Sequence, residues 1–267
     1  MDAAQRLPTD EAYRNLRRLV EHDPNVVGFI LGGSRGKQFE TGHSDYDCYV
    51  IVRDEAADAY VSKLAAFSPP LDVIVQSLTQ FRDEPVPSWN RYNFAHLTAE
   101  VDRLGGEIQR IVEHKATLDS TDASAAARWA LPAYTNSVYR SLKSLRDGRQ
   151  FEARLDAAES INYFLIALFS VLGRLRPYNK LLRWELEKYP IAQWRTSELL
   201  SRIDRVITTA DPVSQRELFR RLELLALERG FAEAFVAWRD EQLSYIRADP
   251  HDLRDGSGSR GARDEAE

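Results

Sequence analysis

The chain has 267 residues, of which 43% are hydrophobic, enough to bury a sizeable core and to form two small domains. Its formal net charge of −5 argues against binding to nucleic acid or to anionic membranes. The single cysteine, Cys48, excludes an internal disulfide bond, and neither the charged N-terminus nor any apolar run resembles a signal peptide or a membrane span. We therefore expect a soluble, cytoplasmic protein.

Residues 1–118 alternate between strand-like and helical patterns. The strand-like runs are short, apolar and bounded by Gly or Pro, whereas the helical segments repeat apolar residues every three or four positions. Thr9 or Asp10 can cap the first helix, which we expect to end before Pro24. The elements that follow are a strand at 26–31, a strand from Asp45 to Val52, a helix at 56–67, a strand at 71–75, a strand at 96–103 and a helix at 107–116.

The first two strands are joined by a segment whose residues suit a ligand. Gly32 and Gly33 allow backbone N–H groups to approach a ligand closely, and Ser34 adds a hydroxyl at an expected helix N-terminus, which suits phosphate. On the second strand Asp45 and Asp47 are expected to point to the same face, roughly 7 Å apart. Two carboxylates on one face repel each other unless a cation lies between them, so this strand suits a divalent metal.

A third carboxylate, Asp72, opens the strand at 71–75. With it, the first 120 residues or so resemble the DNA polymerase β-like nucleotidyltransferase superfamily. The signature of that superfamily is an apolar strand, a Gly-[Gly/Ser]-Ser turn, an acid-x-acid strand and a third acid on the following strand. The chain matches it without departure, at Gly32, Gly33, Ser34, Asp45, Asp47 and Asp72.

The resemblance implies a reaction and a role for each matching residue. A hydroxyl attacks the α-phosphate of a nucleoside triphosphate and expels pyrophosphate, and a pair of magnesium ions clamps the attacking and leaving oxygens. Asp45, Asp47 and Asp72 would hold the magnesium together with the triphosphate, whose β- and γ-phosphates would lie on Gly33 and Ser34. Asp72 would also take the proton from the attacking hydroxyl, although Glu159, in the second half of the chain, is an alternative general base.

The second half of the chain is expected to be helical. Its segments repeat apolar residues at helical spacing and are joined by short loops, as in a helical bundle. The second of these helices is expected to bury a stripe that includes Leu155, Ala158, Ile161 and Leu165. The predicted fold class is therefore α+β, with a nucleotidyltransferase catalytic domain containing a small mixed sheet at 1–118, a helical-bundle substrate domain at 119–247 and a disordered tail at 248–267.

Polar positions on the first two bundle helices are further candidates. On the first of these helices Asn136, Arg140 and Lys143 fall at i, i+4 and i+7 and form one polar stripe. The resemblance implies that a cation from the helical domain meets the triphosphate, and Lys143 is the first choice and Arg140 the second. Asp156 and Glu159 share a face of the next helix and would suit an amine-bearing substrate. In both cases the alternative is an ordinary solvated helix face.

The two-domain architecture is similar to that of the aminoglycoside and lincosamide nucleotidyltransferases, in which the bundle helps to bind a small molecule. The resemblance thus implies a magnesium-dependent enzyme of antibiotic resistance that moves AMP from ATP to a hydroxyl of a small, amine-bearing acceptor. Two-domain relatives of this kind often pair as homodimers. Two alternatives stay open. One is adenylylation of a macromolecule, either a protein, as by antitoxin-like nucleotidyltransferases, or a tRNA, and the net charge argues against RNA. The other is a non-catalytic nucleotide-binding scaffold, against which the complete set of acids argues.

Overall fold

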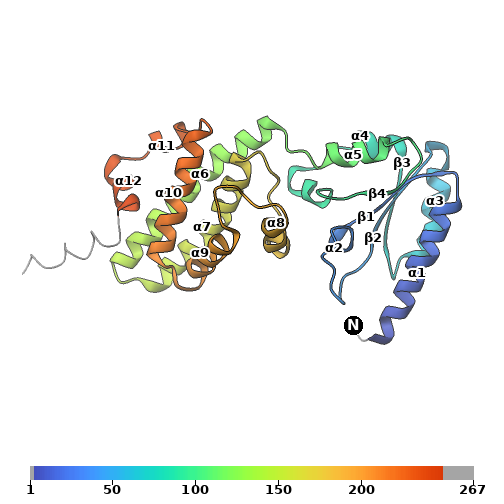
Figure 1. Ribbon diagram of the computed structural model, residues 1–267, viewed down its shortest axis with the longest axis horizontal. Helices are drawn as coiled ribbons and strands as arrows, with labels where there is room; N and C mark the ends of the chain where they lie inside the picture. The colour runs from blue at the N-terminus through green and yellow to red at the C-terminus, as the bar shows by residue number, and fades with distance from the viewer. Residues whose placement is uncertain (1–2, 249–267) are drawn as a thin grey trace, which may run out of the picture. The chain divides into compact units, whose positions relative to one another are not determined.

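A computed structural model describes residues 3–248, and the chain divides into two compact units at residues 1–118 and 119–267 (Figure 1). The first unit contains a small mixed sheet with helices, and the described part of the second is helical. None of the helices within residues 3–248 is long and apolar enough to cross a membrane. The tail expected at 248–267 lies outside the described residues except for Ala248.

The first unit is built on a four-stranded sheet with the strand order β3-β2-β1-β4. β1 pairs antiparallel with both β2 and β4, whereas β2 and β3 run parallel. The helices and strands of this unit are α1 (Ala3–His22), β1 (Val26–Leu31), α2 (Gly33–Gly36), β2 (Asp47–Val52), α3 (Ala57–Leu64), β3 (Asp72–Ser77), α4 (Leu78–Asp83), β4 (Ala99–Asp102) and α5 (Glu107–Lys115).

Helices cover both faces of this sheet (Figure 1). On one face Cys48 and Val50 of β2 belong to a buried cluster with residues of α1 and α3. On the other face Ile51 packs with Phe81 of α4 and with residues of α5. Because side chains alternate along a strand, Asp47 points to the α4/α5 face of the sheet and Cys48 to the opposite face.

The acidic strand is shorter than the sequence predicted, because β2 begins at Asp47 and not at Asp45. Beyond Leu31 the chain turns into α2, and the backbone hydrogen bonds between β1 and β2 end with the one from Gly32 N–H to the Asp47 carbonyl at 2.7 Å. Asp45 therefore has no strand residue of β1 opposite it. The prediction that Asp45 and Asp47 lie on one strand is wrong in this respect.

Two other boundaries also differ from the prediction. The first helix begins at Ala3, so Thr9 and Asp10 lie inside it and do not cap it. The strand expected at 96–103 is limited to Ala99–Asp102. A helix that was not predicted, α4, starts with a capping box in which Ser77 Oγ accepts from Gln80 N–H at 3.1 Å and Gln80 Oε1 accepts from Ser77 N–H at 2.9 Å.

The second unit is a set of packed helices. Asp119 caps its first helix by accepting from Thr121 N–H at 2.7 Å, and Asp211 caps α10 in the same way from Ser214 N–H at 2.8 Å. The apolar pattern of Phe235, Val236, Trp238 and Leu243 predicts a single last helix, whereas the structure divides this segment into two short helices. The bounds are α6 (Ser120–Arg146), α7 (Gln150–Val171), α8 (Leu182–Lys188), α9 (Thr196–Thr209), α10 (Pro212–Glu228), α11 (Glu233–Val236) and α12 (Asp240–Arg247).

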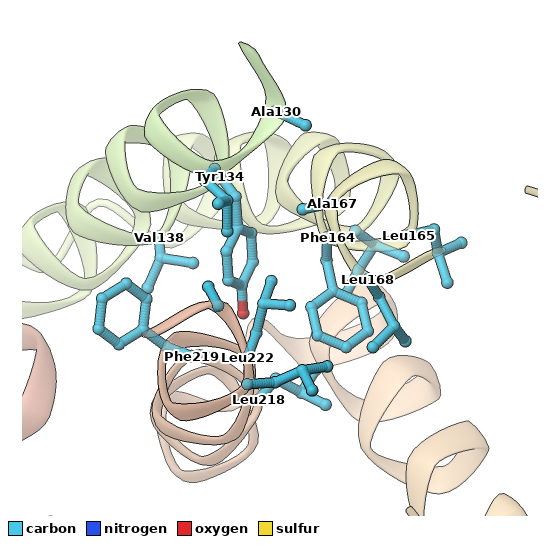
Figure 2. Packing of buried hydrophobic residues seen from close by; sticks show 14 of the residues in the cluster. Ala130, Tyr134, Val138, Phe164, Leu165, Ala167, Leu168, Leu218, Phe219 and Leu222 are labelled. Carbon is cyan, nitrogen blue, oxygen red and sulfur yellow. The ribbon is translucent and has the colours of Figure 1, made fainter. Parts of the chain in front are cut away.

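The core of this unit lies where α6, α7 and α10 meet (Figure 2). Tyr134 of α6 is fully enclosed, with its ring centroid 5.4 Å from that of Phe164 on α7 and 6.1 Å from that of Phe219 on α10. Figure 2 shows its hydroxyl directed into the side chains of Leu218 and Leu222. Large apolar side chains from three helices therefore close this core.

The N-terminal half of α7 buries a different face from the predicted one. Leu155 is 56% exposed, and the small residues Ala153 and Ala157 are buried instead. Ser141 Oγ of α6 donates to the Ala153 carbonyl at 2.9 Å, which shows how closely the two backbones approach. The predicted stripe is correct further along, where Ile161 and Leu165 enter the core.

Candidate functional site

The turn after β1 brings its glycines against the carboxylate of Asp47. Gly33 has a φ of +57°, and a β-carbon added to it would stand 1.9 Å from Asp47 Oδ2. A β-carbon at Gly32 would stand 3.2 Å from the Asp47 β-carbon. Only glycine fits Gly33, both for its backbone conformation and for the space available. The turn and the carboxylate thus form one packed unit.

Asp72 lies directly beside Asp47. The two residues are partners in the parallel register of β2 and β3, and Asp72 N–H donates to the Tyr46 carbonyl at 2.9 Å. Neighbouring strands are about 4.8 Å apart, so the two carboxylates occupy adjacent positions on the same face of the sheet. Asp72 is exposed and Asp47 is half-buried. Since two adjacent carboxylates repel each other, this arrangement favours a bound cation.

The segment that carries Asp45 is held by Arg35, a residue to which the sequence analysis gave no role at the site. The Arg35 guanidinium donates to the Ser44 carbonyl at 3.0 Å and to the Asp45 carbonyl at 3.1 Å, and it lies 3.8 Å from the centroid of the Tyr46 ring. Burial alternates from Asp45 onward, with Asp45 exposed and Tyr46 buried, so the extended pattern of β2 continues upstream of the strand. The feature of the sequence that could have indicated this role is the position of Arg35 directly after Gly32-Gly33-Ser34.

The structure brings together two of the three predicted metal ligands. Within residues 3–248 no group of three or more His, Cys, Asp or Glu side chains is arranged to hold a metal ion. Asp47 and Asp72 are adjacent, and Asp45 lies two residues before β2. Magnesium in proteins is commonly bound by one or two carboxylates together with phosphate oxygens of a substrate and water. The Asp47–Asp72 pair fits that donor set.

Cys48 takes no part in this site. It is fully buried on the α1/α3 face of the sheet, and burial, with smaller contributions from Asp47 and Asp72, raises the pKa of its thiol to about 12. A thiol with that pKa is protonated at neutral pH and is therefore a poor nucleophile. Cys48 is therefore a core residue.

In the helical unit, two of the candidates bind each other. Arg140 of α6 forms an ion pair with Asp156 of α7, at 2.6 Å between Nη2 and Oδ1. Asp156 is 8% exposed, and burial raises the pKa of its carboxyl group above the ordinary value, with Arg140 acting in the opposite direction and Glu159 in the same one. Arg140 thus has a structural partner inside its own unit, so Lys143 is the better candidate for binding an anion.

Three further candidates lie on helix surfaces. Asn136, Lys143 and Glu159 are all exposed. Asn136 and Lys143 share the polar face of α6, as the i and i+7 spacing predicted. Exposed positions of this kind are open to a ligand, and they equally suit a solvated surface.

Comparison with known proteins leaves this site to be interpreted from its own residues, because the chain matches no protein-family model and no curated protein is significantly similar to it. The arrangement combines a glycine turn, a half-buried carboxylate against that turn, and a second, exposed carboxylate beside the first. Chemically, such a site can bind a divalent cation that also holds phosphate oxygens, and its exposed carboxylate can accept a proton.

Proposed function

We propose that this chain is a magnesium-dependent nucleotidyltransferase that moves AMP from ATP to a hydroxyl group of a small molecule and releases pyrophosphate. The observation that carries the proposal is the packing of the Asp47 carboxylate between the Gly33 turn and Asp72. The N-terminal unit would be a polymerase β-like nucleotidyltransferase domain, and adenine is taken from the resemblance of the sequence to that superfamily.

Each residue of the site has a role in this proposal. Asp47 and Asp72, with Asp45 upstream, would hold magnesium, which supplies positive charge at the phosphoryl oxygens where negative charge develops. The backbone of Gly32 and Gly33 and the hydroxyl of Ser34 would position the β- and γ-phosphates. Arg35 would fix the segment that carries Asp45 through its bonds to the Ser44 and Asp45 carbonyls.

In the reaction the acceptor oxygen forms a bond to the α-phosphorus of ATP, and the bond from that phosphorus to the bridging oxygen of the β-phosphate breaks. The electron pair of the broken bond leaves with pyrophosphate. The proton of the acceptor hydroxyl passes to the Asp72 carboxylate, which is exposed and can pass it on to solvent. Asp72 is a better base than Glu159 because it lies beside Asp47.

The proposal is tested by pyrophosphate release from each of the four nucleoside triphosphates with magnesium, in the presence of a panel of hydroxylated small molecules. Release that requires ATP and one panel member, and that is lost in Asp47→Asn, supports it. The matched control is Asp58→Asn, which removes an exposed carboxylate from α3 and should retain full activity. Activity that persists in Asp47→Asn would overturn the proposal.

A further inference from the structure

A pocket of about 190 Å³ opens on the α4/α5 face of the sheet in the first unit. Its walls include Tyr49 of β2, Ile74 of β3, Val86 and Phe94, and the rings of Tyr49 and Phe94 lie 5.4 Å apart. An apolar protein cavity of about 150 Å³ can hold a benzene molecule, so this pocket has room for one ring.

The pocket continues directly from the carboxylates. Tyr49 follows Asp47 by two residues on β2, and Ile74 follows Asp72 by two residues on β3, so all four side chains share one face of the sheet. Tyr49 and Ile74 are themselves partners in the parallel register. A step of two residues along a strand is about 7 Å, which is the reach of a small ring with one substituent.

Lys115 places a buried ammonium group in the wall of the pocket. Its side chain is 7% exposed, and Nζ lies 5.2 Å from the ring centroid of Phe81 and 5.9 Å from that of Phe94. Nζ donates one hydrogen bond, at 2.8 Å, to the Glu84 carbonyl, its one hydrogen-bond acceptor among the described residues. An ammonium group has three N–H donors, so two remain for a ligand. Burial lowers the pKa of Lys115, with Glu84 and Asp83 acting in the opposite direction, and an added oxygen that accepts from Nζ would offset part of this desolvation.

The segment that closes the pocket contains two prolines and leaves a polar rim. Pro85 and Pro87 restrict the backbone there and carry no N–H group. At the rim Gln76 Nε2 donates to Glu84 Oε2 at 2.6 Å. The pocket thus has apolar walls, one buried donor and a hydrogen-bonded edge, which is the composition of a small-molecule subsite.

We propose that this pocket binds the acceptor, and that the acceptor carries a ring with an apolar face and an oxygen that accepts a hydrogen bond from Lys115. The assignment to the acceptor rests on the proposed function. The Lys115 ammonium group disfavours an amino group on the part of the ring that reaches it, since like charges repel, whereas Glu84 is the acidic residue of the pocket lining. The acceptor class is therefore a ring compound with a free hydroxyl and with no amino group on the side that faces Lys115.

The strand order places this pocket on the correct side for an acceptor. The Gly-Gly-Ser turn follows β1, and the sheet order is β3-β2-β1-β4, so Ile74 of β3 and the turn are on opposite sides of β2. In phosphoryl-type transfer the attacking and leaving oxygens are roughly in line across the phosphorus. If the β- and γ-phosphates lie on the turn, the attacking oxygen enters from the β3 side, where Asp72 and the pocket lie.

The test uses para-fluorobenzamide, a single ring with a carbonyl oxygen, as a probe observed by fluorine NMR line broadening with the full-length protein. We expect binding to the wild type, loss of binding in Ile74→Trp, which fills the pocket from a partly exposed position, and weakening by about tenfold in Lys115→Met, which keeps the apolar stem but removes the donor. Val61→Trp, at an exposed position of α3, is the matched control and should bind the probe as the wild type does.

ATP binding with magnesium, measured by calorimetry on the same proteins, separates the acceptor from the nucleobase. We expect the ATP affinity of Ile74→Trp to equal that of the wild type. Equal probe binding by the wild type and Ile74→Trp would contradict the proposal that this pocket binds a ring. Loss of ATP binding in Ile74→Trp would identify the pocket as a nucleobase site. If the wild type binds the probe but not ATP, the proposed function fails and the assignment to an acceptor fails with it, while the ring-binding site stands.

Discussion

The Asp47 carboxylate occupies the space where the side chain of any other residue at Gly33 would begin, since a β-carbon there would stand 1.9 Å from Asp47 Oδ2. This contact ties the turn after β1 to the first residue of β2. It also places a carboxylate against a turn made of two consecutive glycines. The proposed chemistry depends on this contact more than on any other in the chain.

Gly33→Ala is predicted to lower the rate of pyrophosphate release by about 100-fold or more, because displacement of a catalytic group by even 1 Å has an effect of that size. The substitution must move Asp47 or the turn, since the added carbon overlaps Oδ2. Gly105→Ala is the matched control. Gly105 has a φ of +63° with no atom within 4 Å of an added β-carbon, so it introduces the same backbone strain, about 1 kcal/mol, without the collision. Equal activities for the two variants would contradict the account.

Tyr134→Phe is predicted to leave the helical unit as stable as the wild type or to stabilise it by about 1 kcal/mol. The Tyr134 hydroxyl is buried and has no hydrogen-bond partner among the described residues, and burial raises its pKa (Figure 2). Tyr245→Phe is the control, because its hydroxyl donates to the Leu142 carbonyl at 3.0 Å and its removal should cost about 1 kcal/mol. Urea unfolding measures both, and a marked loss of stability in Tyr134→Phe would reveal a partner for its hydroxyl.

Asp23→Asn is predicted to reduce the stability of the first unit at neutral pH by about 1 to 2 kcal/mol. Bonds from Tyr60 Oη and Lys63 Nζ lower the pKa of the Asp23 carboxyl from 3.8 to about 2. Because the pKa is lowered in the folded state, the stabilisation is present above pH 4 and is lost as the pH falls toward 2. The wild type should therefore lose stability between pH 4 and 2 more steeply than Asp23→Asn, as measured by urea unfolding at each pH. Parallel curves would contradict this assignment.

Arg140→Met and Lys143→Met are predicted to act differently although the two residues lie on one helix. Loss of Arg140 leaves the buried Asp156 without its cation and should lower the unfolding free energy by about 1 kcal/mol at neutral pH. This effect should vanish in acid, where Asp156 is protonated with or without Arg140. Lys143→Met should leave stability unchanged and weaken binding of ATP with magnesium, measured by calorimetry. Unchanged ATP binding would make Lys143 an ordinary surface residue.

Two strands of the first unit, β1 and β3, could be predicted from the sequence because each is a short apolar run with a break beside it. β1 is predicted with the bounds that the structure shows, and β3 begins one residue later than expected. The start of β2 could not be predicted, since Asp45 has the same local pattern as Asp47. What distinguishes them is the partner strand, which ends at Leu31.

The buried face of α7 shows a second limit of prediction from the sequence. Apolar periodicity selected Leu155, whereas the helix buries Ala153 and Ala157 against a neighbour close enough for the Ser141–Ala153 hydrogen bond. Small residues that permit close approach of two backbones carry little hydrophobic signal. For the same reason the burial of Asp156, which follows from its place on that face, was not expected.

The candidate site, too, could be predicted from the sequence only in part. Asp47, Asp72 and the glycine turn were recognisable because a few positions of one motif lie close together in the sequence. The pocket beside them combines Tyr49, Ile74, Phe94 and Lys115, which are far apart along the chain and have no common spacing. Such a pocket depends on tertiary packing and becomes visible only in the folded structure.

The most direct test of the account compares ATP labelled at the α-phosphate with ATP labelled at the γ-phosphate, incubated with magnesium and the acceptor panel. We predict that the α-label alone moves to a small-molecule product, that the γ-label appears in pyrophosphate, and that both changes are absent in Asp47→Asn and retained in Asp58→Asn. Transfer of the γ-label to the acceptor, or transfer of the α-label by Asp47→Asn at the wild-type rate, would contradict the account.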